Sequence, residues 1–438
     1  MRKWAIGAAK RQFLRALEGM TDGFVELVCP DGTYAFGDAH SDLRGLVAVH
    51  DERFFLRALT GGDTGMGESW MDGDWSSPDL VAVVRLALRN TARLEAGHRW
   101  TSAVRRLADR MGQWRRANTP GGSRRNIHAH YDLGNDFFSL FLDRRLVYSC
   151  AYFSHPGQSL EEAQVGKLDR ICRKLDLRPT DRVLEIGTGW GAFAIHAARE
   201  YGCHVTTTTI SREQYEYVRA RLETMPEVAR RITLRCQDYR ELTGTFDRLV
   251  SIEMFEAVGF AFYDRFFAAC DRLLAPDGAM LLQTITMQDQ RFRAYLQQAD
   301  WTQKYIFPGG QLASMAGMLA SVQRATRLTL HHAEEIGVHY ARTLEAWRER
   351  FLAVRASVRA QGFDERFIRM WDFYLGSCAA AFRERYIGDV QLLLARNGCR
   401  RALLNEPWRD GPGEGAPARG TAGLDERREA VRGAIAAS

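Results

Sequence analysis

The sequence predicts an α/β protein built on a doubly wound, Rossmann-like sheet, with a smaller N-terminal α+β domain before it. Three observations predict this fold class. Residues 182–191, RVLEIGTGWG, have the pattern of a buried strand that runs into a glycine turn and then a helix. From residue 181 onward, strand-like and helix-like segments alternate. Residues 1–104 show shorter, half-buried strands with turn signals instead.

The first part of the chain is the predicted α+β domain. Phe24–Val28 alternates like a half-buried strand, and Pro30-Asp31-Gly32 is a turn signal before a second strand at 34–36. Residues 80–88 have the apolar spacing of a helix. We place the end of this domain near residue 104.

An arginine-rich segment, residues 105–125, follows and is predicted to be a basic helix and then a linker. Two interpretations stay open for it. A run of charge is often a solvated helix face. The same charges could attract anionic lipid, with about 1 kcal/mol for each well-placed cation.

Residues 126–404 form the predicted main domain. Its strands are expected at 182–186, 204–208, 232–236, 246–252 and 280–286. An aromatic-rich insertion at 290–326 interrupts the alternation, and residues 340–396 have the pattern of a long helical stretch. The tail, 405–438, is rich in Gly, Pro, Ala and charge, which predicts disorder.

Composition bounds the class of protein. The chain has 438 residues, of which 46% are apolar, and this permits two full cores. Its eight cysteines form no CxxC pair, which argues against a zinc site or a disulfide framework and for a reducing cytosol. His128 and His130 stand beside acids, but no further spaced ligands complete a metal site. The sequence has no run of about 20 apolar residues, so any work on membranes is expected from the surface.

Polar side chains follow the predicted strands at the edge where a doubly wound sheet binds ligands. Thr209 and Gln214 follow the second strand, where dinucleotide enzymes often place an acid for a ribose hydroxyl. Asp238 and Tyr239 follow the third strand and could hold an adenine through a carboxylate and a stacking face. The alternative for Tyr239 is simple core packing.

Two carboxylates three residues apart, Glu253 and Glu256, follow the fourth strand in an otherwise apolar run. Such groups are costly to bury unless paired, so one of them is a catalytic candidate. A capping role at a helix N-terminus fits Glu253 better than Glu256. Cys150 could be a nucleophile only with a base in reach, and we prefer a role for its backbone N–H.

Five separated motifs resemble those of the cyclopropane-fatty-acyl-phospholipid synthase family, to which the mycolic acid cyclopropane synthases are closely related. The motifs are HYDLGNDFF at 130–138, YSCAYF at 148–153, LEIGTGWG at 184–191, EMFEAVG at 253–259 and YIFPGG at 305–310. The resemblance runs from about residue 61 to about residue 397. It implies a class I methyltransferase fold and transfer of a methyl group from S-adenosylmethionine to a cis double bond in a lipid acyl chain.

The resemblance also implies roles for particular residues. Those that would bind S-adenosylmethionine are Tyr148, Ser149, Gly187, Gly189, Thr209, Gln214, Asp238, Tyr239 and Ile252. The family binds a bicarbonate ion beside the sulfonium, and the matching groups are the Cys150 and Ile285 backbones, Glu256, Gln283 and Tyr340. Bicarbonate would take the proton that is lost on ring closure. Aromatic residues available to line the cavity are Phe153, Phe255, Trp301, Tyr305 and Phe307.

Two positions depart from the common family pattern. Many members have histidine where this chain has Ala257 and where it has Gln283. The expected product is a cyclopropane fatty acid, and another fate of the carbocation would give a methylene or methyl branch. A methyltransferase acting on a small molecule, or a lipid- or nucleic-acid-binding module without activity, are further alternatives.

The partners follow from these expectations. The substrate lies in a bilayer, so the catalyst must dock, and residues 1–104 and 105–125 are the candidates for docking on anionic phospholipid. The net charge of +6 permits this. No motif that reads DNA or RNA appears, so no nucleic acid is expected. The expected location is cytoplasmic, peripheral on the inner face of the membrane, and the resemblance suggests a homodimer.

Overall fold

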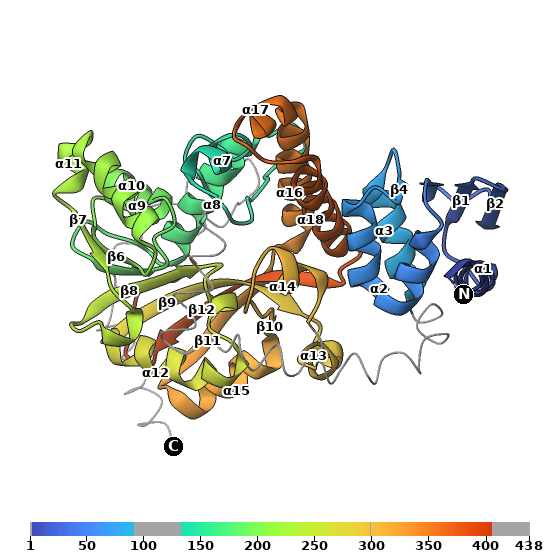
Figure 1. Ribbon diagram of the computed structural model, residues 1–438. Coiled ribbons are helices and arrows are strands. Elements are labelled where there is room, and N and C mark those ends of the chain that lie inside the picture. Colours follow the sequence, from blue (N-terminus) through green and yellow to red (C-terminus); the bar gives the residue numbers. More distant parts are fainter. Residues whose placement is uncertain (1, 92–132, 298, 405–438) are drawn as a thin grey trace, which may run out of the picture. The chain divides into compact units, whose positions relative to one another are not determined.

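A computed structural model describes residues 2–91, 133–297 and 299–404 (Figure 1). Its larger sheet has the order β11-β12-β9-β8-β5-β6-β7, and β10 pairs with β9. The strands are β5 (Arg182–Ile186), β6 (His204–Thr209), β7 (Ile232–Cys236), β8 (Phe246–Ile252), β9 (Leu274–Met287), β10 (Ala313–Ser314), β11 (Leu328–Glu335) and β12 (Ile387–Arg396). Strands β5 to β9 pair in parallel, while β12 is antiparallel to both of its neighbours.

Helices connect these strands. They are α7 (Asn135–Ser139), α8 (Leu160–Lys174), α9 (Ala192–Glu200), α10 (Arg212–Glu223), α11 (Pro226–Ala229), α12 (Tyr263–Leu273), α13 (Asp289–Tyr295), α14 (Trp301–Tyr305), α15 (Met315–Ala325), α16 (Gly337–Ala353), α17 (Arg355–Ala360) and α18 (Glu365–Arg383). Three short 3-10 helices lie at Tyr239–Glu241, Phe255–Ala257 and Phe260–Phe262.

Both faces of the larger sheet are buried, as a doubly wound sheet requires. Val183 and Leu281 pack with residues of α8 and α9 in one core. Their chain neighbours Leu184 and Leu282 pack with residues of α12 and α15 in another. Successive side chains of a strand point to opposite faces, so this division places helices on both sides of the sheet (Figure 1). The predicted fold class is confirmed.

The sequence prediction for residues 340–396 was wrong in its last part. α16 and α18 are helices, but residues 387–396 form strand β12, which lies between the edge strand β11 and β9. Short apolar runs fit a buried strand or a buried helix equally well, and this run follows directly on a real helix. Strand β11 was also missed, because most of its residues are exposed or half-buried at the sheet edge.

The N-terminal part contains α1 (Arg2–Glu18), α2 (Arg53–Met71) and α3 (Leu80–Arg89) with a four-stranded sheet of order β2-β1-β3-β4. The strands are β1 (Phe24–Cys29), β2 (Gly32–Gly37), β3 (Arg44–Val49) and β4 (Trp75–Ser76). The predicted strand–turn–strand unit is present as the antiparallel pair β1–β2. The Asp79 carboxylate accepts from the backbone N–H of Ala82 and caps α3, which begins where the apolar spacing placed it.

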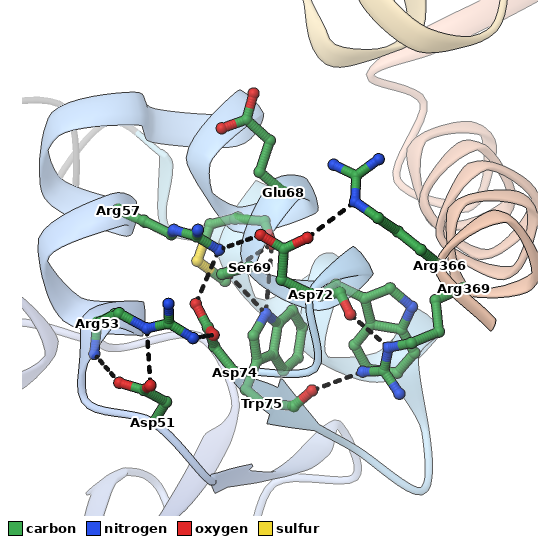
Figure 2. Close-up of polar contacts among 12 residues, drawn as sticks. Asp51, Arg53, Arg57, Glu68, Ser69, Asp72, Asp74, Trp75, Arg366 and Arg369 are labelled. Atoms are coloured by element: carbon green, nitrogen blue, oxygen red, sulfur yellow. Dashed lines mark hydrogen bonds and ion pairs between the residues drawn. The ribbon is translucent and has the colours of Figure 1, made fainter. Parts of the chain in front are cut away.

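The end of α2, the start of β4 and the turn between them contact α18 through two arginines (Figure 2). Arg366 donates to the Asp72 carboxylate at 2.9 Å. Arg369 donates to the carbonyl oxygens of Trp70 at 2.5 Å and Trp75 at 2.8 Å, and its guanidinium lies over the Trp70 ring. These contacts join the N-terminal part to α18, which packs against α16.

We expect Arg369→Met to lower the free energy of unfolding by about 2 kcal/mol, because it leaves two carbonyl acceptors without a charged donor. The control, Arg366→Met, should cost less than about 1 kcal/mol, since the Arg366–Asp72 pair is half exposed. Urea unfolding of both variants measures the difference. Equal losses would show that the two arginines contribute alike.

Several predictions lie outside the described residues. These are the basic linker at 105–125, His128 and His130, and the tail at 405–438. Among the helices that are described, not one has the length and apolarity needed to cross a membrane.

Candidate active site

A large cavity opens at the carboxyl ends of the parallel strands. Its volume is about 1670 Å³. Of the residues predicted from the sequence, the cavity lining includes Tyr148, Ser149, Gly187, Gly189, Thr209, Gln214, Asp238, Tyr239, Ile252, Glu256, Ile285 and Tyr340. The side chains of Cys150 and Gln283 are fully buried beside this lining. The fold therefore brings the predicted set together, and the roles of its members remain predictions.

The glycine turn after β5 provides the close approach that a nucleotide-like ligand needs. Gly187 and Gly189 have φ of 102° and 50°, which glycine adopts without strain. A Cβ atom at Gly189 would meet no protein atom within 4 Å, so this face of the turn is open. Helix α9 starts at Ala192 without a side-chain cap and presents its first N–H groups. The turn has the open backbone that is expected from the sequence beside the methionine part of S-adenosylmethionine, and that role stays a prediction.

Polar contacts prepare the predicted ribose and adenine positions. The Thr209 hydroxyl donates to Gln214 Oε1 at 2.8 Å and fixes that amide. Asp238 forms a bidentate ion pair with Arg240, at 2.8 and 2.6 Å. A carboxylate keeps further acceptor capacity in such a pair. The Tyr239 ring packs edge-on against Phe266 at 5.4 Å between ring centroids, so it contributes to the core as well as to the lining.

The tyrosine and serine predicted at the methionine part are also held in place. Tyr148 Oη lies 3.0 Å from Tyr374 Oη. The Ser149 hydroxyl accepts from the buried ammonium of Lys167 at 2.8 Å. Burial lowers the pKa of Lys167, while the nearby Glu253 carboxylate opposes that shift. Lys167 is therefore a cation of the site that the motifs did not reveal.

Glu185, at the end of β5, is a buried acid that lines the cavity. Desolvation raises its pKa to about 8, although Thr207 donates to its carboxylate at 2.6 Å. Between the ordinary value of 4.5 and the raised value, the folded protein holds a proton that the unfolded chain releases. Stability from this residue is therefore present at low pH and is lost as pH rises through that window.

We expect Glu185→Gln to remove this pH dependence, because glutamine stays neutral. Relative to the variant, the wild type should lose at most about 5 kcal/mol of unfolding free energy as pH rises across the window. Urea unfolding of the ligand-free protein at several pH values measures this. Parallel pH profiles for the two proteins would show that Glu185 is ionised in the folded state throughout.

Glu253 collects three of the donors that the resemblance assigned to bicarbonate. The backbone N–H of Cys150 donates to Glu253 Oε1 at 2.8 Å, and the Gln283 amide donates to the same oxygen at 2.7 Å. The Tyr340 hydroxyl donates to Oε2 at 2.6 Å. Glu253 is thus no helix cap; it lies just beyond β8 and faces the cavity.

Glu256 takes the fourth donor. The Ile285 backbone N–H donates to Glu256 Oε1 at 2.5 Å, and the Thr284 hydroxyl donates at 2.8 Å. Burial and the neighbouring Glu253 raise the pKa of Glu256 to about 7. Among the described residues, no group donates to the buried Oε2 of Glu256. All four donors expected for bicarbonate are therefore satisfied by carboxylates of the chain, and they do not fit a separate bicarbonate ion.

The thiol of Cys150 is unsuited to nucleophilic attack. Complete burial raises its pKa well above the usual value, and Sγ lies against the carbonyl oxygens of Ala151 and Ile336. Its contribution to the site is the backbone N–H, as the sequence favoured.

Asp389 is an acid of the site that sequence reasoning missed. Burial and the adjacent Glu253 raise the pKa of Asp389 well above its usual range, and the Gln283 amide also donates to it, at 3.2 Å. The signal was an aspartate in the mainly apolar run of 387–396. It carried no weight while that segment was predicted as a helix.

The fold and the site together define a methyltransferase that uses S-adenosylmethionine. Residues 120–392 match the family described as mycolic acid cyclopropane synthetase. The chain is 39% identical to the cyclopropane-fatty-acyl-phospholipid synthase of Escherichia coli over 86% of this chain and 94% of that protein. It is 37% identical to the tuberculostearic acid methyltransferase of Mycobacterium tuberculosis, over 85% and 88% respectively. The chain belongs to the mycolic acid cyclopropane synthetase family.

A solved structure agrees with this assignment. The mycolic acid cyclopropane synthase CmaA1 in complex with SAH and CTAB superposes with a TM-score of 0.58 at 34% identity. The match covers 62% of this chain and 98% of that one.

Proposed function

We propose that this enzyme methylates the cis double bond of unsaturated acyl chains in membrane phospholipids and closes a cyclopropane ring. One observation carries the proposal: the glycine turn and the buried carboxylates line the same large, mainly apolar cavity. An alkene is a weak nucleophile, so the methyl donor must be held in line and away from water. A small polar substrate would need neither this volume nor these walls.

The cavity walls suit a cationic intermediate. Trp301 and Phe307 line the cavity, and the π faces of aromatic rings stabilise positive charge. Phe307 packs against Tyr374 at 5.7 Å and Tyr148 at 6.4 Å between ring centroids. Of the other aromatic residues considered, Phe255 packs in the core beneath the sheet against Tyr263 and Phe266.

The second candidate product is a methylene- or methyl-branched chain. One observation favours it: a relative at 37% identity is named a tuberculostearic acid methyltransferase. The carbocation is the same in both reactions and only its later fate differs. Ala257 lines the cavity at a position where many family members have histidine. The residue at this position is a candidate for determining which product forms from the carbocation.

Mass spectrometry of acyl chains separates these products. Phospholipid vesicles are incubated with the enzyme and S-adenosylmethionine that carries a deuterated methyl group. A ring product that retains two of the methyl deuterons supports cyclopropanation. An exocyclic methylene product supports the branched alternative, and no labelled lipid at all would reject both and favour a small-molecule substrate.

Docking is proposed to occur at an anionic membrane surface on the cytoplasmic side. Helix α1 supports this, because Trp4 is 77% exposed and Arg11 and Arg15 are exposed on the same helix. Tryptophan favours the membrane–water interface, and each cation adds about 1 kcal/mol near anionic lipid. If added salt does not weaken binding to anionic vesicles, electrostatic attraction does not contribute to docking. The homodimer remains a prediction from the resemblance.

A further inference from the structure

The donors around Glu253 form an anion-binding arrangement in which the orientation of the Gln283 amide is fixed by its neighbours. Lysine can only donate, so Lys174, which contacts Gln391 Oε1 at 2.7 Å, turns the Gln391 NH₂ group away. That NH₂ group donates to Gln283 Oε1 at 3.0 Å. The Gln283 NH₂ group must therefore face Glu253, together with the Cys150 N–H and the Tyr340 hydroxyl. Three donors converge on one place, and a carboxylate of the chain fills it.

The backbone of Glu253 is distorted in a way that serves this placement. Its φ is 46°, and Glu253 is one of five non-glycine residues with positive φ in the described part of the chain. This conformation costs an L-residue about 1 kcal/mol or more and persists only where the surroundings enforce it. The backbone N–H of Glu253 donates to the Gln283 carbonyl at 2.8 Å, which fixes the turn. Strain of this kind is typical of functional sites.

The charges of the site disfavour a second anion. The side chains of three acids, Glu253, Glu256 and Asp389, lie close enough to interact electrostatically. Lys167 is a buried cation that interacts with Glu253 and Asp389. Burial raises the pKa of both Glu253 and Asp389. Three donors hold the Glu253 carboxylate, whereas the Gln283 amide donates to Asp389 at 3.2 Å and Asp389 Oδ1 has no donor among the described residues. Negative charge is therefore better stabilised on Glu253 than on Asp389, which leaves Glu253 as the carboxylate placed to accept a proton.

We propose that the Glu253 carboxylate occupies the place that the family resemblance gives to bicarbonate and takes the proton released after methyl transfer. This inference rests on the proposed function. The alkene π pair forms the bond to the methyl carbon, and the C–S bond breaks with its electron pair going to sulfur. A carbocation remains on the other alkene carbon. Glu253 removes a proton from the new methyl group, the C–H pair closes the ring, and the proton on Glu253 is then released to solvent.

The test compares Glu253→Gly with the wild type in buffer freed of carbon dioxide. Glycine suits a φ of 46°, so this variant opens the anion site without straining the turn. Wild-type lipid methylation should not change when bicarbonate is added. The variant should lose about 100-fold or more in rate, the usual contribution of a positioned base, and should regain activity with added bicarbonate. Bicarbonate-dependent wild-type activity, or a fully active variant without bicarbonate, would overturn the proposal.

Binding gives a readout that does not depend on turnover. In isothermal titration calorimetry the wild type should not bind bicarbonate, whereas Glu253→Gly should bind it through the three freed donors. Bicarbonate binding by the wild type would overturn the proposal for Glu253, even if no lipid is methylated. If bicarbonate binds only to Glu253→Gly and no lipid is labelled by either protein, only the proposed function is rejected. Asp176→Gly is the matched control, because Asp176 is an acid with a φ of 49° that does not line the cavity. It should match the wild type in both measurements.

Discussion

Replacing Gly189 by valine should weaken S-adenosylmethionine binding by about 100-fold or more, which corresponds to about 2.7 kcal/mol. The Cβ of the new residue would meet no protein atom within 4 Å, so the added side chain projects into the open face of the turn. That space is where we expect the cofactor to approach the backbone. Calorimetric titration with S-adenosylhomocysteine measures the loss without any lipid substrate.

Gly202→Val controls for the backbone strain. Gly202 has a φ of 68° just after α9, and the nearest atom to its added Cβ would be in Pro179 at 3.6 Å, an ordinary van der Waals contact. Both variants force a β-branched residue into the left-handed region and should lose similar stability. Only Gly189→Val should lose cofactor affinity. Equal affinities in the two variants would place the cofactor away from this face of the turn.

The parallel half of the sheet could be predicted closely because its signals are local. Residues 182–186 and 232–236 are apolar or alternating runs bounded by turns, and their limits match β5 and β7. Residues 387–396 carry a similar run, but their pairing with β9 depends on residues 100 or more positions away in sequence. Sequence periodicity does not encode such partners, so the strand was predicted as a helix.

The site was predicted as a set of residues but not as a set of contacts. Cys150, Gln283 and Tyr340 were expected to share one anion, and they do share one. Its identity, Glu253, could not be read from spacing, because the turn after β8 decides which of two carboxylates three residues apart meets those donors. The positive φ of Glu253 decides it, and no pattern in EMFEAVG requires that conformation.

The two carboxylates therefore have different surroundings and are expected to have different tasks. Glu253 accepts hydrogen bonds from three donors, which stabilise its ionised form against the burial that raises its pKa and suit the proton-accepting role proposed for it. Glu256 has one oxygen held by Ile285 and Thr284 and one that no described group contacts. Glu256 lines the cavity, and its carboxylate, when ionised, is suited to stabilising a cation that develops beside it.

Glu256→Gln should lower the rate of lipid methylation by about 100-fold while S-adenosylmethionine affinity changes by less than about threefold. Glutamine keeps the shape of the side chain and its Oε1 contacts, so the fold should persist. What is lost is the negative charge beside the carbocation. Steady-state rates with labelled S-adenosylmethionine and unsaturated vesicles, together with cofactor titration, measure the two effects separately.

Thr284→Val distinguishes the charge of Glu256 from its position. This variant removes the 2.8 Å hydrogen bond to Oε1 but leaves the carboxylate and the Ile285 N–H contact. If the charge matters, Thr284→Val should lose less than about tenfold in rate, far less than Glu256→Gln. If the two variants lose equal activity, the orientation of Glu256 is the important property. Near-normal turnover in Glu256→Gln would remove Glu256 from the mechanism and leave Glu253 as the acid of the site on which the chemistry depends.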